Sequence, residues 1–192
     1  DGIVVAPGFG SRGVEGKLTA LRYAREKGIP TLGICLGMQC MAIEFARNVL
    51  GYKDANTAEI DSQTEHKVID LMDAQKSVTD LGGSMRLGGY PCQLKKESKL
   101  AEAYGKQLIR ERHRHRYEFN SAFLDEFEQH GFNAVGVNPD NGLIEALELQ
   151  GHPWYIGVQY HPEYKSTVLN PSPLFMSFVR AAIAYRQAKG KK

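Results

Sequence analysis

The stretch Pro30-Thr31-Leu32-Gly33-Ile34-Cys35-Leu36-Gly37-Met38-Gln39 decides the fold of this chain. It predicts a buried strand that ends on a cysteine and turns at once into a helix. Leu32 and Ile34 supply the apolar strand positions, and the residues after them carry apolar side chains at helical spacing as far as Val49.

Two glycines, Gly33 and Gly37, flank Cys35 at two residues on either side. This Gly-x-Cys-x-Gly pattern is the thiol counterpart of the Gly-x-Ser-x-Gly nucleophile elbow. Strand and helix approach each other closely at such a turn, so a side chain at either glycine would clash. The turn would present the Cys35 sulfur at a helix N-terminus, where free N–H groups and the helix dipole favour the thiolate. The alternative is a buried structural cysteine, a common state of this residue.

Composition places the chain among ordinary globular proteins. Its 192 residues suit one domain, and a net charge of +2 gives no electrostatic reason to expect nucleic acid or a membrane surface as partner. No apolar run approaches the ~20 residues of a membrane span, and no signal peptide is visible. The three cysteines lack CxxC spacing, which argues against disulfides or a zinc site and predicts a reducing, cytoplasmic setting.

The first fifty residues alternate between strand and helix. Residues 2–6 form an apolar run typical of a strand buried on both faces, and residues 15–27 predict a helix that stops at Gly28. Together with the elbow, this order predicts an α/β fold with an open, mostly parallel central sheet flanked by helices. Functional loops are then expected at the carboxyl ends of the strands.

A glycine-rich loop at residues 7–13 joins the first strand to the first helix. Gly8, Gly10 and Gly13 match the dinucleotide-binding fingerprint. That fingerprint also requires an acidic residue at the end of the next strand, where this chain has Cys35, so nucleotide binding at the loop is disfavoured. We expect the loop to point backbone N–H groups at a developing negative charge instead.

The rest of the chain predicts further strands and helices. Predicted strands cover residues 68–72, 91–94, 110–119, 134–137, 143–149 and 154–160, and predicted helices cover residues 98–104, 121–130 and 173–189. Residues 82–89 are rich in glycine and are predicted to be a flexible segment.

Residues 110–119 carry the densest run of charge. In a strand, their alternation would place arginines on one face and histidines on the other. The run could be a solvated edge strand or a basic patch for phosphate, and His113 with His115 could bind a metal, although no third ligand is evident. A further interpretation is that one arginine clamps a substrate carboxylate, which suits the fork of a guanidinium.

A thiol nucleophile needs a base, and the base needs a group that orients it. His161 follows a predicted strand, as Cys35 does, so both can lie at one edge of the sheet. Pro162 fixes the backbone between His161 and Glu163, and Glu163 can hold one imidazole nitrogen while the other faces the sulfur. The sequence therefore predicts a triad of Cys35, His161 and Glu163.

These motifs resemble a known family. Residues 33–39 together with residues 161–163 resemble the triad motifs of class I glutamine amidotransferases. Residues 112–118 and 82–88 are similar to narrower motifs of the glutaminase domain of CTP synthases. The resemblance covers essentially the whole chain, and it implies a flavodoxin-like fold with a C-terminal antiparallel strand extension.

The resemblance implies hydrolysis of L-glutamine to glutamate and ammonia. Cys35 would attack the γ-amide carbon, and His161, oriented by Glu163, would protonate the leaving ammonia and then activate water. Backbone N–H groups of Gly8 and Leu36 would form the oxyanion hole, where one donor is typically worth ~3 kcal/mol of barrier.

The resemblance also implies a set of glutamine contacts. Glu59 would bind the α-ammonium group and Arg116 the α-carboxylate. The full set of residues expected to contact glutamine is Gly8, Phe9, Leu36, Gly37, Met38, Gln39, Glu59, Arg116 and Tyr117. No metal is expected in this domain. One departure from the family pattern is Pro7, which has no N–H to offer at the oxyanion loop.

By the same resemblance, residues 1–192 form one glutamine amidotransferase domain that lacks its first strands and an upstream amidoligase domain. The full-length enzyme would be a homotetramer that uses ATP and Mg²⁺, with GTP as activator, to aminate UTP to CTP, while this domain would need no cofactor. The alternatives are a glutaminase subunit of another class I amidotransferase, a γ-glutamyl hydrolase, or a non-catalytic regulatory or assembly module.

Overall fold

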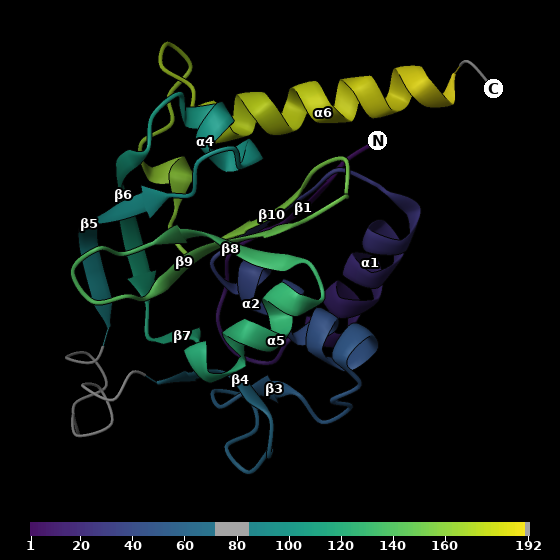
Figure 1. Ribbon diagram of the computed structural model, residues 1–192, viewed down its shortest axis with the longest axis vertical. Helices are drawn as coiled ribbons and strands as arrows, with labels where there is room; N and C mark the ends of the chain where they lie inside the picture. Colours follow the sequence, from purple (N-terminus) through teal and green to yellow (C-terminus); the bar gives the residue numbers. More distant parts are fainter. Residues whose placement is uncertain (72–84, 191–192) are drawn as a thin grey trace.

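The computed structural model describes residues 1–71 and 85–190. Within them, a seven-stranded sheet runs through the middle of the molecule in the order β1-β2-β10-β9-β8-β5-β6 (Figure 1). Its strands, in chain order, are β1 Ile3–Val5, β2 Thr31–Ile34, β5 Arg86–Leu94, β6 Leu108–His115, β8 Phe132–Val137, β9 Ile144–Leu149 and β10 Tyr155–Val158. A three-stranded sheet is formed by β3 Asn56–Thr57, β4 Lys67–Leu71 and β7 Tyr117–Phe119.

Parallel pairing is confined to the end of the large sheet that carries the elbow. Strand β2 pairs in parallel with β1 on one side and with β10 on the other. The four remaining neighbour pairs of the described sheet are antiparallel. The predicted α/β class and antiparallel extension are confirmed, with the extension forming more than half of the sheet.

Helices cover both faces of the large sheet (Figure 1). Helices α1 Val14–Lys27, α2 Leu36–Phe45 and α5 Leu124–Gln129 pack into one apolar cluster, which includes Leu21, Met41 and Phe127. Helices α4 Lys99–Tyr104 and α6 Pro173–Lys189 pack into a second cluster. The other helical segments in the described part of the chain are a π-helical turn at Ala46–Leu50 and 3₁₀ turns at Ser121–Phe123 and Pro162–Tyr164.

The predicted elbow is present between β2 and α2. Cys35 has φ 52° and ψ −107°, a positive φ that non-glycine residues rarely adopt. A Cβ at Gly33 would lie 2.4 Å from Met41 Sδ, and one at Gly37 would lie 2.1 Å from the Val5 carbonyl oxygen. Both glycines are therefore required by close approach, as the sequence pattern indicated.

The densely charged run forms two strands, β6 and β7, separated at Arg116. Side chains alternate along β6 between exposed and buried, with the arginines outside and Glu111, His113 and His115 inside. The predicted separation of arginines and histidines is confirmed. In contrast, the prediction of a flexible segment at residues 82–89 is wrong for residues 86–89, which lie in β5 and pair with β6. Residues 82–84 lie outside the described residues.

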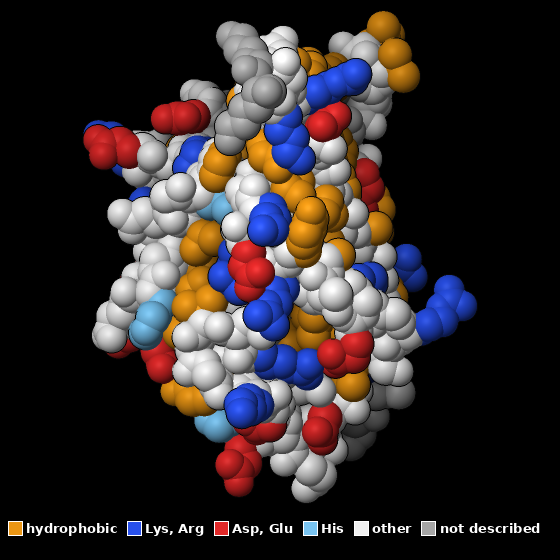
Figure 2. Space-filling view, turned by 90° about the vertical axis from the view of Figure 1, so that its right-hand side faces the viewer, with side chains coloured by type: hydrophobic (Ala, Val, Ile, Leu, Met, Phe, Trp, Pro, Cys, Tyr) orange, Lys and Arg blue, Asp and Glu red, His pale blue; other side chains and the backbone are white. Residues whose placement is uncertain are grey.

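Charges of both signs mix on the face at the right of Figure 1, where α1 lies (Figure 2). Arg22 and Glu26 pair within α1 at 2.8 Å, and Arg47 pairs with Glu15 at 2.9 Å. Among the described helices, none is long and apolar enough to cross a membrane.

Candidate active site

A cavity of about 250 Å³ opens at the carboxyl ends of β1 and β2. It collects side chains from the glycine loop, the elbow, the segment after β3 and the β6–β7 junction. Its lining residues are Gly8, Phe9, Cys35, Gln39, Glu59, Met85, Arg114, His115, Arg116 and Tyr117.

Most of the predicted glutamine contacts line this cavity, and three do not. Leu36, Gly37 and Met38 are absent from its lining. The Leu36 and Met38 side chains are buried, Gly37 lies against Val5, and Met38 packs against Gly157. Their side-chain positions therefore face the core, and any contact with a ligand would have to come from their backbone.

Three lining residues were not predicted as glutamine contacts: Met85, Arg114 and His115. For Arg114 and His115 a signal existed, because they belong to the same charged run as Arg116. The guanidinium of Arg114 lies 5.8 Å from the ring centroid of Phe9, so these two side chains close one wall together. Met85 precedes β5 and belongs to residues 82–88, which resemble a motif of CTP synthases, so a signal existed for it as well.

Cys35 is almost fully buried, and its sulfur has two polar neighbours. Sγ lies 4.0 Å from the Arg114 carbonyl oxygen and 3.6 Å from Nε2 of Gln159. Burial raises the pKa of the thiol to about 12, with a smaller contribution from the Glu163 carboxylate, while the Leu36 N–H acts in the opposite direction. The expected effect of the helix N-terminus is present, because the Leu36 N–H lowers the pKa of Cys35, but burial has the larger effect and the pKa is raised overall.

His161, the predicted base, is held in place by several contacts. Its Nδ1 lies 2.6 Å from Glu163 Oε1, and its backbone N–H donates to the Arg112 carbonyl oxygen at 2.8 Å. Its ring stacks on Tyr164 with centroids 4.6 Å apart. Nε2 is buried and has no hydrogen-bond partner among the described residues. The imidazole is thus fixed on one side and available on the other.

The elbow and the His161 segment meet at one edge of the sheet. The Cys35 N–H donates to the Val158 carbonyl oxygen at 2.8 Å, and Val158 pairs with Ile34 in the parallel ladder. Glu163 is close enough to Cys35 to act on the pKa of its thiol. The predicted triad residues are therefore brought to the same site by the β2–β10 pairing.

The predicted oxyanion donors are also neighbours. A Cβ at Gly8 would lie 3.3 Å from Leu36 Cδ2, so the glycine loop rests directly on the first turn of α2. The loop is held in turn by Glu59, whose Oε1 accepts from the Gly10 N–H at 3.1 Å. Glu59 therefore has a structural contact in addition to its predicted role toward an α-ammonium group.

A buried charge network lies directly behind the cavity wall formed by His115. Arg86 Nη2 donates to Glu145 Oε1 at 2.6 Å, and its Nη1 lies 3.6 Å from Glu118 Oε2. His113 Nδ1 and His115 Nε2 lie 2.8 Å apart. Desolvation lowers the pKa of His113 to about 2 and of His115 to about 3, so both rings are neutral. The two ring nitrogens that face each other are occupied by this contact, which leaves little support for the metal-ligand interpretation.

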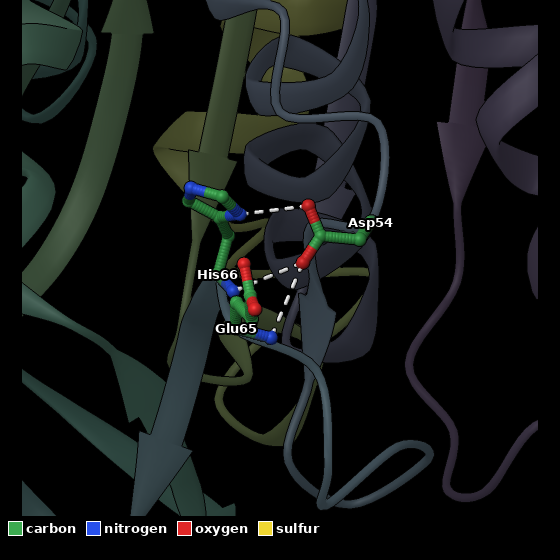
Figure 3. Close-up of side chains that lie close together, drawn as sticks. All are labelled: Asp54, Glu65 and His66. Atoms are coloured by element: carbon green, nitrogen blue, oxygen red, sulfur yellow. Dashed lines mark hydrogen bonds and ion pairs between the residues drawn. The ribbon is translucent and has the colours of Figure 1, made fainter.

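One group of described residues, Asp54, Glu65 and His66, has the composition and spacing of a metal site (Figure 3). Its Asp54 oxygens already accept several hydrogen bonds. Oδ1 lies 2.7 Å from His66 Nδ1, and Oδ2 accepts from the backbone N–H groups of Glu65 and His66 at 3.2 Å each. This arrangement, at the surface, is that of a carboxylate that stabilises a turn.

The chain is similar to known proteins over nearly its whole length. Residues 1–181 match the family model "Glutamine amidotransferase class-I". The chain is 69% identical over 187 residues to a CTP synthase of Porphyromonas gingivalis, and 61% identical over 183 residues to one of Bacteroides fragilis. These alignments cover 97% and 95% of this chain, but only 35% and 34% of the two relatives. The chain thus spans about a third of their length.

A solved structure agrees with the sequence relatives. The glutaminase domain of Trypanosoma brucei CTPS, determined with bound acivicin, superposes with a TM-score of 0.90 at 38% sequence identity. The match covers 96% of this chain and 71% of that one. On these findings and on the elbow, triad and cavity, the chain belongs to the class I glutamine amidotransferases, among the glutaminase domains of CTP synthases.

Proposed function

We propose that this domain hydrolyses L-glutamine to glutamate and ammonia through a γ-glutamyl thioester on Cys35. The observation that carries the proposal is the cavity, because it joins the Cys35 thiol to one carboxylate, Glu59, and to the arginines Arg114 and Arg116. These charges suit the α-ammonium and α-carboxylate groups of a free amino acid. A side chain with a γ-amide can then extend from them toward the sulfur.

The reaction begins with transfer of the Cys35 proton to Nε2 of His161, whose Nδ1 stays paired with Glu163. The thiolate attacks the γ-carbon, and the oxyanion is bound by the N–H groups of Gly8 and Leu36. Collapse of the tetrahedral intermediate breaks the C–N bond, and His161 protonates the departing ammonia. His161 then takes a proton from water, the hydroxide cleaves the thioester, and the proton returns to sulfur as glutamate leaves.

In the intact protein, the proposed fate of the ammonia is ATP-dependent amination of UTP to CTP. This is supported by the name and the high identity of the Porphyromonas gingivalis relative. By the same resemblance, the amidoligase domain would bind ATP, Mg²⁺ and UTP, GTP would act as activator, and the enzyme would be a cytoplasmic homotetramer. L-Glutamine is the only ligand proposed for the residues described here.

Covalent labelling tests the glutaminase proposal. Acivicin, the ligand in the Trypanosoma brucei structure, should label Cys35 of the intact protein, as measured by mass spectrometry of its peptides. Cys40 and Cys92 serve as internal controls, because both are buried and neither lines the cavity that Cys35 lines. Labelling at either of them instead of Cys35 would contradict the proposal, and absence of labelling would favour a non-catalytic module.

Product analysis separates the proposed acceptor from the alternatives. The Cys35→Ala variant should lose glutamine-dependent CTP formation and keep ammonia-dependent CTP formation, because it removes only the ammonia source. If glutamine is hydrolysed but UTP is not aminated with either nitrogen donor, the chain serves another class I amidotransferase.

A further inference from the structure

Gln159 is a fully buried residue that the triad mechanism does not use. It follows β10, and its backbone N–H donates to the Glu145 carbonyl oxygen at 2.8 Å. Its side chain lies between two residues of the active site. Nε2 donates to Cys35 Sγ at 3.6 Å, and Oε1 accepts from Gln39 Nε2 at 3.2 Å.

The orientation of the Gln159 amide is fixed through Gln39 by the backbone carbonyl group of Tyr117. Gln39 Nε2 also donates to the Tyr117 carbonyl oxygen at 2.9 Å, and a carbonyl oxygen can only accept. The amide nitrogen of Gln39 must therefore face Tyr117, and its second hydrogen faces Gln159. If the Gln159 amide were reversed, two N–H₂ groups would oppose each other, so the Gln159 nitrogen must lie on the sulfur side.

We propose that Gln159 stabilises the thiolate of Cys35, with its N–H₂ group held toward the sulfur by Gln39 and the Tyr117 carbonyl. This inference rests on the proposed function, in which the thiolate is the attacking species. The resting thiol faces a different partner, the Arg114 carbonyl oxygen at 4.0 Å, which only a protonated sulfur could use as an acceptor. Loss of the proton leaves the Gln159 N–H₂ group as the side-chain donor on the sulfur.

The surroundings of Cys35 explain why such a donor is needed. Burial and the carboxylates Glu163 and Glu59 all disfavour the thiolate, whereas hydrogen bonds from the Leu36 N–H and the Gln159 amide favour it. Hydrogen bonds to a charged acceptor are roughly twice as strong as neutral ones. Gln159 has no exposed surface, so water cannot easily replace its amide if the side chain is changed.

Alkylation kinetics of Cys35 provide the test, because iodoacetamide reacts with thiolate and not with thiol. The intact protein is treated between pH 6 and pH 10, and the rate at Cys35 is followed by peptide mass spectrometry. Gln159→Met, which keeps the length of the side chain without its N–H₂ group, should alkylate about tenfold more slowly across this pH range, because a smaller fraction of Cys35 is thiolate at each pH. An unchanged profile in a folded Gln159→Met variant would overturn the inference.

Two further variants separate the donor from packing defects. Gln39→Met keeps the Gln159 N–H₂ group but removes the contact that orients it, so its alkylation rate should fall in the same direction as that of Gln159→Met and by less. A larger fall for Gln39→Met than for Gln159→Met would assign the effect to packing and would also overturn the inference. If Gln159→Met fails to fold, Gln159→Asn, whose shorter amide withdraws the donor, takes its place.

Steady-state kinetics complete the test. Gln159 does not line the cavity, so Gln159→Met should lower kcat for glutamine about tenfold and change KM little, while Gln39→Met should raise KM. The exposed Gln63→Met is the matched control and should change neither constant. A rise in KM without a fall in kcat for Gln159→Met would count against it. If Cys35 alkylation shifts as expected but wild-type protein does not hydrolyse glutamine, the proposed function fails and the role of Gln159 toward the thiolate stands.

Discussion

Gly37 lies so close to Val5 that a Cβ on Gly37 would be 2.1 Å from the Val5 carbonyl oxygen. This contact brings the end of β1, and with it the glycine loop, onto the first turn of α2. The same approach places Gly8 against Leu36. The absence of one side chain in the elbow therefore positions the loop that is expected to bind the oxyanion.

Gly37→Ala should therefore destabilise the protein strongly. The added methyl group meets backbone atoms that cannot move away easily, so we expect the free energy of unfolding to fall by about 3 kcal/mol. Gly16→Ala is the matched control, since Gly16 lies within α1 and a Cβ there meets nothing within 4 Å. That change should stabilise the protein by about 0.5–1 kcal/mol. Urea denaturation measures both, and equal effects would contradict the steric argument.

Glu163→Gln should lower the rate of glutamine hydrolysis with little change in KM. Glu163 contacts His161 at 2.6 Å, and in the proposed mechanism it would stabilise the imidazolium that forms when Cys35 loses its proton. Because the Glu163 side chain is 34% exposed, water will partly replace its charge, so we expect kcat to fall roughly 10²-fold. Glu102→Gln, on the exposed side of α4, is the control, and a similar loss there would indicate a nonspecific effect.

Arg116→Ala should raise KM for glutamine by about tenfold or more, because a charge-assisted pair with the α-carboxylate is lost. Arg112, on β6, is exposed and does not line the cavity, so Arg112→Ala should leave KM unchanged. Both constants come from steady-state glutaminase assays. In the intact protein, a fall in ammonia-dependent CTP formation for Arg116→Ala would show that the residue does not act through glutamine binding.

The raised pKa of Glu118 should make the stability of the protein depend on pH. Its carboxyl is buried, and desolvation raises its pKa from the ordinary 4.5 to about 8, although Arg86 acts in the opposite direction. A raised carboxyl pKa means that the folded state prefers the protonated form. The stabilisation is therefore complete below pH 4.5 and is lost as the pH rises through about 8.

Glu118→Gln should remove this part of the pH dependence, since an amide does not ionise. Relative to the wild type, the variant should gain stability as the pH rises from 5 to 9. Some slope should persist, because burial also raises the pKa of Glu145. Urea denaturation at pH 5, 7 and 9 measures the effect, and parallel curves for variant and wild type would show that Glu118 does not titrate in this range.

The lowered pKa of Asp54 should have the opposite effect, a loss of stability in acid. Slight desolvation raises the pKa of its carboxyl, but hydrogen bonds from His66 and Thr64 outweigh it and lower the pKa from 3.8 to about 2. The stabilisation is present above pH 3.8 and is lost as the pH falls through about 2. Asp54→Asn should lower the melting temperature at pH 6 and lessen its decline between pH 4 and pH 2. A melting temperature unchanged at pH 6 would contradict the turn-stabilising role.

The sequence was sufficient wherever the chemistry depends on local spacing. The glycines around Cys35 act within one turn, and Pro162 links His161 to Glu163 across two bonds of the chain. The alternation along β6 fixed which side chains face inward. The positions of these side chains follow from the regular geometry of a single strand, turn or helix, and neighbouring residues are enough to predict such an element.

The rest of the site depends on residues far apart in the sequence. Gln159 meets Cys35 across 124 positions, and the Arg86 network joins residues from β5, β7 and β9. No periodicity within one segment indicates such contacts. Residues 86–89 also depend on a contact with a distant segment. Their glycine content predicted flexibility, but pairing with β6 makes them part of a strand.

By itself, the sequence determined the elbow and predicted the three triad residues and the charged groups suited to a free amino acid. Only the tertiary structure decided how strongly burial raises the pKa of Cys35 and which groups surround its sulfur. The physical reason is that a pKa depends on burial and on every charge and dipole nearby. Burial and nearby charges are set by how the strands assemble, and the order of residues along a single strand does not reveal that assembly.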